Sequence, residues 1–506
     1  MGRLALGPRL FLVATWLGIA LWLLFYAFVY LHFSYNLFRF PFDFDQGEGY
    51  DVNSAWALIQ GSSVYASPDA YPFYSSNYPP LYTLALTPAV ALLGPRLSLG
   101  RLLSIVATAL VVALIVAAVR RETGRWRPGL VAGLLFLASP YVCHTTPLAR
   151  VNAFTLALAL GGVVASSVAA ADKTRSTGRW HLLAGGLLLA ALYAKPAAFD
   201  AVAASLLYMI LHDRRRGLLV AGALLGLGGA LFVLMDVATA GGFSLNVIWA
   251  NANSFSPEQA LVYYQDFLEI HPLLVGVALL VILFGLRQGP RGLSVYGWYF
   301  LIALAAAVGT GKWGAGESYF LPALAAGCVL CGLGLARLGG LLARVGRPAV
   351  AVALVFALLL ASGWQLLLLW HGPWSWPEMG AYDRGAQAGA LGRAPTAVDT
   401  AAGWKIVEDY VRQTKGDILA EETTFLLIDG RRVLGNATQQ RNLYDAGRHD
   451  PSALVGMLDR REIGLVILNA QQYPAPVLAA VGRNYYALDS VEMNGYRYLL
   501  LVPGGR

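Results

Sequence analysis

The run from Leu10 to Leu31 contains 22 residues without a single charged side chain. At a rise of about 1.5 Å per residue, a helix of this length crosses a hydrocarbon core about 30 Å thick. More apolar runs follow, and only 13% of the whole chain is charged, whereas soluble domains carry about 25% charged residues. We therefore expect an integral membrane protein, built mainly from transmembrane helices.

The first apolar run follows Arg3 and Arg9, as the apolar core of a secretory signal peptide would. It is longer than the roughly 7–15 residues of such a core, and no small-residue cleavage site follows it. We interpret it as an uncleaved first span.

The basic residues are distributed unevenly among the loops between the apolar runs. Of the 23 Lys and Arg residues before residue 372, 17 fall in short loops that one topology places on the same side. Such an excess marks the cytoplasmic side of a membrane protein. The remaining tail has 14 basic and 15 acidic residues, so it is nearly neutral. The net charge of +8 therefore indicates topology, and no nucleic-acid partner is expected.

With these loops in the cytoplasm, the apolar runs predict about eleven spans in an inner or plasma membrane. The N-terminus is then cytoplasmic, and the C-terminal part is extracytoplasmic. Several runs are shorter than the roughly 20 residues of a full crossing, so the bounds are approximate. The expected spans are 10–31, 97–119, 129–143, 150–171, 181–194, 197–211, 217–238, 272–286, 294–310, 319–336 and 349–371.

The chain divides into a transmembrane domain (1–371), a Pro-, Gly- and Trp-rich linker (372–400) and an extracytoplasmic α/β domain (401–506). Residues 32–96 of the first part form an extracytoplasmic loop, called the acidic loop below. In the last part, helical and strand-like patterns alternate, as in a small α/β fold. We expect helices at 403–415 and 451–462, one or two short strands within 416–429, and strands at 463–469 and 496–503.

The acidic loop carries four carboxylates within nine positions, in the stretch "FDFDQGEGYD". They are Asp43, Asp45, Glu48 and Asp51. Glycines flank Glu48 and allow the backbone to approach a ligand closely. A carboxylate held near a hydrocarbon boundary has a raised pKa, which suits a general base. Taken singly, Asp43, Asp51 and Asp69 are more typical of a solvated loop.

Three basic residues stand at predicted extracytoplasmic ends of spans, namely Arg150 in "PLARVNAF", Lys195 in "LYAKPAAF" and Lys312 in "GTGKWGAGESYFLP". Ionisable groups at membrane depth are functional candidates, although such side chains also extend to the interface without further function. The spacing of Lys312 and Glu317 is also compatible with a simple ion pair. Fixed cations at this level suit an anion such as a lipid phosphate.

Motifs of other chemistries are absent from the sequence. There is no GxxxxGK[ST], no HExxH, no GxSxG and no GxGxxG after a strand. No cofactor is expected. Asp43, Asp45 and Glu48 offer a loose site for a divalent metal, but the chemistry expected below does not require one.

In their order and sidedness, these elements resemble the membrane glycosyltransferases of the C-type fold. They are most similar to the bacterial branch of protein mannosyltransferase-like and aminoarabinose-transferase-like enzymes, over about the first 340 residues. The shared elements are the acidic loop after the first span, "YPPLY", an ARxD-like "ARVN", the lysine of "YAKP" and the late "GAGESYFLP" turn.

The resemblance implies that an acid of the first loop deprotonates the acceptor, and that basic residues hold the phosphate of a polyprenyl-phosphate sugar. This chain departs from the family pattern twice. Where the family commonly has adjacent Asp and Glu, this chain has Gly47 and Glu48, so the role falls to either Asp45 or Glu48. The last residue of the ARxD element is Asn152, which can orient a sugar but cannot act as an acid or base.

The resemblance therefore predicts a cell-envelope glycosyltransferase that transfers a sugar from polyprenyl phosphate to a hydroxyl of a lipid, glycan or protein acceptor, with inversion. Glu48 is the first choice for the base and Asp45 the second. The expected substrate-binding residues are Asp43, Arg150, Asn152, Lys195, Lys312, Glu317 and Tyr319. One alternative is a non-enzymatic flippase or transporter of lipid-linked sugars, which needs the cations but no base. Another is a membrane scaffold that carries the C-terminal domain as a binding module.

Overall fold

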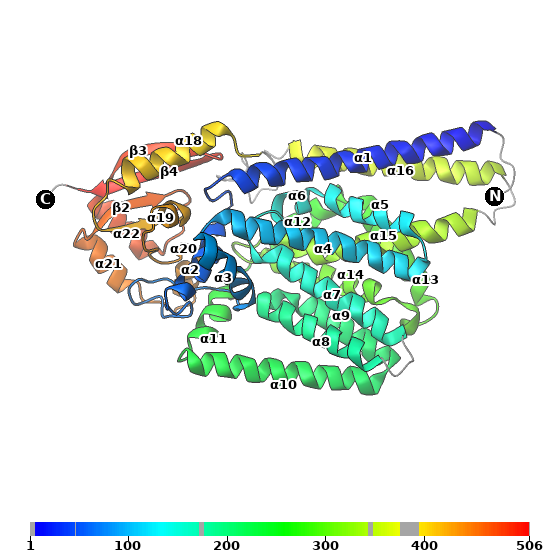
Figure 1. Cartoon of the computed structure of the whole chain (residues 1–506), viewed down its shortest axis with the longest axis horizontal. Helices are drawn as coiled ribbons and strands as arrows, with labels where there is room; N and C mark the ends of the chain where they lie inside the picture. Colours follow the sequence, from blue (N-terminus) through cyan, green and yellow to red (C-terminus); the bar gives the residue numbers. More distant parts are fainter. Residues whose placement is uncertain (1–5, 46, 172–176, 343–347, 375–393, 505–506) are drawn as a thin grey trace.

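The computed structural model describes residues 6–45, 47–171, 177–342, 348–374 and 394–504. The molecule is elongated, with a helical bundle at one end and a small α/β domain at the other (Figure 1). We call the end of the bundle against which this domain packs the domain-bearing end.

Among the described residues, five helical segments are long and apolar enough to cross a membrane: Leu17–Arg39, Leu97–Thr123, Val151–Ala171, Arg214–Ala238 and Glu317–Leu338. A bent pair of helices, Pro257–Ile270 and Pro272–Leu286, meets at 89° and adds a sixth candidate if it is one broken span. Several shorter apolar helices complete the bundle. A mainly helical, polytopic membrane protein is thereby confirmed.

The helices of the bundle are bounded as follows. The first half contains α1 (Leu6–Arg39), α2 (Glu48–Ile59), α3 (Leu81–Leu93), α4 (Leu97–Thr123), α5 (Trp126–Ala138), α6 (Pro140–Thr145), α7 (Val151–Ala171), α8 (Thr177–Ala194), η1 (Pro196–Ala198) and α9 (Phe199–His212). The second half contains α10 (Arg214–Ala238), α11 (Gly242–Val247), η2 (Trp249–Asn251), α12 (Pro257–Ile270), α13 (Pro272–Leu286), η3 (Pro290–Gly292), α14 (Val295–Ala306), η4 (Ala307–Gly311), η5 (Glu317–Phe320), α15 (Leu321–Leu342) and α16 (Pro348–Trp374).

Small residues bring the helices of the bundle close together. A Cβ added at Gly162 of α7 would lie 2.8 Å from the Leu188 side chain of α8, and one added at Gly100 of α4 would lie 2.7 Å from Ala149. Membrane helices associate through such close packing, because lipid tails are as apolar as the side chains themselves. At the edges of the bundle in Figure 1, α1 lies beside α16 on one side and α10 lies on the other.

The C-terminal domain contains a four-stranded sheet in the order β1-β2-β4-β3, with β1 and β2 parallel and the other pairs antiparallel. Its elements are α18 (Ala397–Lys405), the π-helix η7 (Ile406–Val411), β1 (Asp417–Ala420), α19 (Thr424–Ile428), α20 (Ala437–Asp445), α21 (Ser452–Asp459), β2 (Ile463–Leu468), α22 (Ala475–Asn484), β3 (Tyr485–Met493) and β4 (Tyr496–Pro503). The expected helices and three of the strands form. Residues 424–428, however, are helical, and β3 was not predicted. Most of the expected linker, 375–393, lies outside the described residues.

The C-terminal domain packs directly on the acidic loop. The ring of Phe42 lies 5.6 Å from that of Trp404 and 5.5 Å from that of Phe425. The Tyr50 hydroxyl donates to the Glu421 carbonyl at 2.8 Å. Because α1 runs to Arg39, the acidic loop starts at residue 40 and not at residue 32 as predicted. Its contacts with the C-terminal domain begin at Phe42.

Candidate active site

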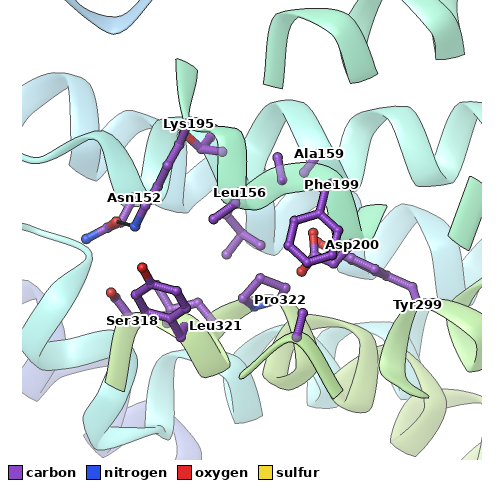
Figure 2. A pocket seen from close by; sticks show the side chains of 15 residues that line it. Asn152, Leu156, Ala159, Lys195, Phe199, Asp200, Tyr299, Ser318, Leu321 and Pro322 are labelled. Carbon is purple, nitrogen blue, oxygen red and sulfur yellow. Dashed lines mark hydrogen bonds between the residues drawn. The ribbon is translucent and has the colours of Figure 1, made fainter. Parts of the chain in front are cut away.

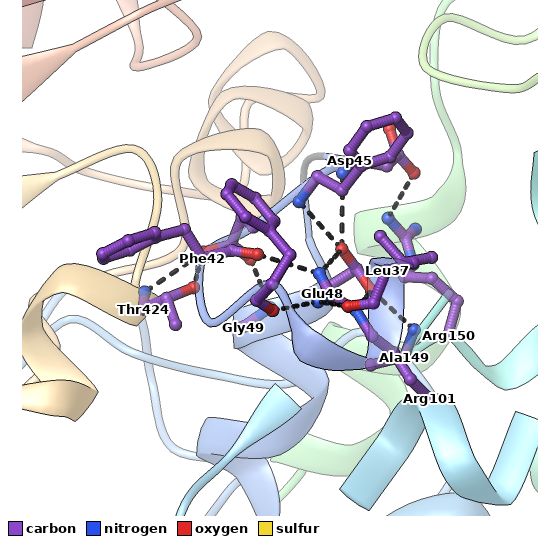
Figure 3. A network of polar contacts seen from close by, with 12 residues as sticks. Leu37, Phe42, Asp45, Glu48, Gly49, Arg101, Ala149, Arg150 and Thr424 are labelled. Carbon is purple, nitrogen blue, oxygen red and sulfur yellow. Dashed lines mark hydrogen bonds and ion pairs between the residues drawn. The ribbon is translucent and has the colours of Figure 1, made fainter. Parts of the chain in front are cut away.

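The candidate residues lie at the domain-bearing end, where α2 starts, α7 starts and α8 ends. Figure 3 shows Asp45, Glu48, Arg101 and Arg150 of this group. The acidic loop turns into α2 at Gly47, whose φ of 100° is unfavourable for residues with a side chain. This turn places successive carboxylates in different surroundings, so each is described separately.

Glu48 is fully buried and paired with Arg101 of α4 (Figure 3). Nε of Arg101 donates to Oε1 at 2.8 Å and Nη2 donates to Oε2 at 2.7 Å. The backbone N–H groups of Phe44 and Ala149 also donate to this carboxylate, at 2.9 and 2.7 Å. Burial would raise the pKa of Glu48, but the charge and hydrogen bonds of Arg101 lower it below its usual value. A carboxylate so enclosed suits a structural clamp rather than a base.

Arg101 is a site residue that the sequence interpretation missed. Besides Glu48, its guanidinium donates to the backbone carbonyls of Leu37, Phe40 and Phe42, which close the end of α1. A sequence signal existed, because Arg101 is one of only six basic residues before 372 outside the cytoplasmic pattern. Its partner was not visible, since Glu48 lies 53 positions away.

Of the three loop acids nearest Arg150 and Arg101, namely Asp45, Glu48 and Asp51, Asp45 is the one whose side chain remains accessible. Its side chain is 31% exposed, and Nη1 of Arg150 lies 3.4 Å from its Oδ2. Its enclosed surroundings raise the pKa of Asp45, while the positive charge of Arg150 opposes this rise. Asp45 therefore combines access with the raised proton affinity of a base.

Asp51 is buried, contrary to the expectation of a solvated residue. Its Oδ2 lies 3.7 Å from Nε of Arg150, so Arg150 stands between Asp45 and Asp51. Burial raises the pKa of Asp51 to about 7, although the charge of Arg150 opposes it. Asp69 is half-exposed, and its carboxylate accepts a hydrogen bond from His449 at 2.5 Å.

Asp43 points into the C-terminal domain. It is buried and accepts hydrogen bonds from the backbone N–H of Gly49 at 2.6 Å and of Thr424 at 3.1 Å, and from the Thr424 hydroxyl. All these partners belong to the protein itself. The geometry therefore favours a structural role for Asp43, in place of the substrate-binding role expected.

Lys195 lies in the turn between α8 and η1. Its Nζ donates to Oδ1 of Asn152 at 2.7 Å and lies 5.0 Å from the ring centroid of Tyr319. Burial lowers the pKa of Lys195 to about 8, and the positive charges of Arg150 and Lys312 act in the same direction. Lys195 therefore lies within electrostatic reach of the other two predicted cations, Arg150 and Lys312.

Lys195 and Asn152 stand at one end of a mostly apolar cavity (Figure 2). Leu156, Phe199 and Pro322 line its walls, and Phe199 is 54% exposed at the surface of the bundle. The cavity thus has a cationic head and mostly apolar walls, to which the Asp200 carboxyl also contributes, and the head suits an anionic group.

Glu317 is buried and pairs with Nδ1 of His144 rather than with Lys312. Nζ of Lys312 instead lies 3.5 Å from the carbonyl oxygen of Asn251. His144 and Glu317 both act electrostatically on Asp45, so the pair borders the same site.

Within the described residues, no three His, Cys, Asp or Glu side chains converge as a metal-binding group. Asp43 and Glu48 of the acidic loop accept hydrogen bonds from the Gly49 N–H and from Arg101, respectively.

Comparison with known proteins gives two kinds of likeness. Residues 77–239 match the family model described as dolichyl-phosphate-mannose-protein mannosyltransferase. No curated protein matches the sequence.

Among solved structures, the chain is similar to ArnT from Cupriavidus metallidurans bound to undecaprenyl phosphate, with 15% identity and a TM-score of 0.57 over 96% of this chain and 99% of that one. The apo state of that protein gives a TM-score of 0.59 at the same identity and coverage. The oligosaccharyltransferase AglB from Archaeoglobus fulgidus, in complex with an inhibitory peptide and a dolichol-phosphate, gives 12% identity and a TM-score of 0.55 over 93% of this chain and 73% of that one. The chain therefore has the C-type fold of the membrane glycosyltransferases.

Proposed function

We propose that this chain is a glycosyltransferase that moves a sugar from a polyprenyl-phosphate carrier to an acceptor hydroxyl at the domain-bearing end. The observation that carries this proposal is the pairing of a partly exposed acid, Asp45, with Arg150 at 3.4 Å, beside the cavity headed by Lys195. Asp45 suits the removal of a proton, and Arg150 and Lys195 suit the binding of an anion.

The donor binds with its phosphate among Arg150, Lys195 and Lys312 and with its prenyl chain along the apolar walls of the cavity. Fixed cations stabilise the negative charge that develops on a departing phosphate. Support comes from the fold, since solved structures of the same fold contain undecaprenyl phosphate or a dolichol-phosphate. Asn152 holds Lys195 in place at 2.7 Å and lies where it can also contact the sugar.

In the proposed reaction, Asp45 takes the proton of the acceptor hydroxyl while the acceptor oxygen attacks C1 of the sugar. The new bond joins that oxygen to C1. The bond from C1 to the phosphate oxygen breaks, and the lipid phosphate leaves with the bonding electrons. A single displacement inverts the anomeric centre. Neither a metal nor a cofactor is needed in this sequence of events.

The domain-bearing end faces the extracytoplasmic side in this proposal. Of the 23 basic residues before residue 372, 17 lie in the loops assigned to the other side of the membrane. The domain-bearing end instead carries the acids Asp43, Asp45, Glu48 and Asp51. Positive loops face the cytoplasm. The acceptor is a lipid, glycan or protein of the cell envelope.

The proposal is tested by mass spectrometry of cell-envelope lipids and glycans from cells that carry the wild-type chain, Asp45→Asn or no chain. We expect a glycosylated product that disappears without the chain and falls at least about 10²-fold with Asp45→Asn, the usual contribution of a general base. Asp69→Asn is the matched control, because Asp69 pairs with His449 away from the cations.

If cells with Asp45→Asn form the glycosylated product at the wild-type level, Asp45 is not the base. A flippase or transporter of lipid-linked sugars, which needs only the cations, would then account better for the site.

A further inference from the structure

A second cavity, of about 700 Å³, opens between the acidic loop, the α10–α11 junction and the C-terminal domain. It is separate from the cavity headed by Lys195, and the two share no lining residue. The residues that matter for its chemistry are Ser63, Ser67, Thr239, Ser244, Trp249 and Arg448. We call it the junction cleft.

Arg448 is the one charged residue among the described residues that line the junction cleft. Its guanidinium lies 3.6 Å from the ring centroid of Trp249, so stacking holds it in position. Within the part of the chain that the structure describes, this side chain makes no hydrogen bond or ion pair. Its N–H donors are therefore oriented by the stack and remain available to a ligand.

Hydroxyl groups add uncharged donors to the same cleft. Oγ of Ser63 accepts a hydrogen bond from the backbone N–H of Tyr65, and Oγ of Ser67 accepts one from Asp69, both at 3.3 Å. Each of these hydroxyls still has its own hydrogen to donate. A stacked arginine with nearby hydroxyl donors is suited to phosphate, which accepts several hydrogen bonds at once.

Asp236, in the last turn of α10, does not line the junction cleft. Oδ1 of Asp236 accepts the backbone N–H of Ser244 at 2.8 Å, which fixes it within the α10–α11 junction. Asp69, on the other side, is paired with His449. The cleft therefore presents a net positive group.

The junction cleft adjoins a lipid-facing helix. Only 11% of the apolar window of α10 is buried inside the protein, and Leu234 and Val237 near its end are 65% and 74% exposed. Ala238, the last residue of α10, lines the cleft itself. A ligand with its anionic group in the cleft would thus meet apolar surface along α10.

We propose that the junction cleft binds the phosphate headgroup of an anionic phospholipid, whose acyl chains lie along α10. A guanidinium group forms charge-assisted hydrogen bonds with a lipid phosphate, and Trp249 is a residue type favoured at the interface. This site is independent of glycosyl transfer, and it stands or falls separately from the function proposed above.

The test measures lipid retained by the purified protein in mixed micelles that contain equal amounts of phosphatidylglycerol and phosphatidylcholine, using native mass spectrometry. We expect wild-type protein to retain phosphatidylglycerol preferentially. Arg448→Gln should reduce this retention about 10-fold, as expected for a lost charge-assisted hydrogen bond. Arg448→Lys, which keeps the charge but not the planar stack, should fall between the two.

Arg483→Gln is the matched control, since Arg483 is exposed, pairs with Asp459 at 3.1 Å and does not line the cleft. Unchanged thermal unfolding of Arg448→Gln would attribute the loss to the site rather than to misfolding. Equal retention of the two lipids by wild-type protein, or equal retention by wild type and Arg448→Gln, would overturn the proposal. So would displacement of the lipid by soluble glycerol phosphate at the same concentration, because that result would indicate a site for free anions.

Discussion

At the scale of single residues, the acids of the acidic loop differ because their partners differ. Glu48 has no exposed surface and two hydrogen bonds from Arg101, whereas the Asp45 side chain is 31% exposed beside Arg150. The same chemical group is therefore a clamp in one position and a candidate base in the other.

Glu48→Gln should destabilise the protein. Removing one partner of a buried ion pair leaves the other charge without compensation, which costs about 3–5 kcal/mol. Thermal unfolding of the purified variant measures this loss. Arg412→Gln, which disrupts the ion pair of the exposed Arg412 with the partly buried Asp429, should change stability by at most about 1 kcal/mol. A Glu48→Gln variant that is as stable as wild type and yet inactive would restore Glu48 as the base.

Lys195→Met and Arg150→Met should each weaken binding of a polyprenyl phosphate. A charge-assisted hydrogen bond is worth about 1.5–3 kcal/mol, which corresponds to roughly 10- to 100-fold in affinity. Titration of the lipid phosphate into the purified variants measures the effect, with Arg287→Met, an exposed residue of a predicted cytoplasmic loop, as the control. Unchanged affinity in both variants would assign these side chains to the membrane interface alone.

At the scale of elements, the acidic loop and the C-terminal domain form one buried polar interface. Asp43 accepts hydrogen bonds from Thr424, and Nδ2 of Asn494 donates to the Asp43 carbonyl at 3.4 Å. Glu422 lies buried in the same interface and accepts a hydrogen bond from the Tyr498 hydroxyl at 2.8 Å. Two acids thus face each other where loop and domain meet.

This interface should lose stability as pH rises from about 4 to 7. Burial and the charge of Glu48 raise the pKa of Asp43 to about 7, and burial and Asp43 raise that of Glu422 well above its usual value. The folded protein therefore binds protons more tightly than the unfolded chain, and the stabilisation present below pH 4 is lost as pH increases. Thermal unfolding across this range should show the decrease. Asp43→Asn should flatten it, whereas an unchanged slope would exclude Asp43 as its source.

At the scale of the whole molecule, the site combines parts that are distant along the chain. Arg150 and Lys195 come from the bundle, Asp45 comes from the acidic loop, and the C-terminal domain holds that loop through Asp43. The bundle, the acidic loop and the C-terminal domain therefore assemble the candidate site together.

The orientation of the molecule can be measured in intact cells with a membrane-impermeant thiol reagent. A cysteine at exposed Ser452 of the C-terminal domain should react, whereas one at exposed Gln288, in the loop before η3, should not. Wild-type protein gives the background of the three native cysteines, Cys143, Cys328 and Cys331. The reverse labelling pattern would invert the topology and place the site in the cytoplasm.

The sequence predicted several elements closely. The expected span 272–286 is α13, and 197–211 matches η1 and α9 to within one residue. Long apolar runs and loop charges are local features, so they can be recognised in the sequence without a structure. The missed strand β3 has a mixed pattern because it lies at the edge of the sheet, where most of its side chains are exposed or half-buried.

The sequence by itself determined the membrane class, the helical bundle, the α/β tail and most residues of the candidate site, although not Arg101, because composition and order along the chain carry that information. Only the tertiary structure decided which of the acids beside Arg150 and Arg101 is accessible. Glu48 is neutralised by Arg101, 53 positions away, and Asp43 is held by Thr424, 381 positions away. Proton affinity and exposure depend on such distant partners, and no local pattern reveals them.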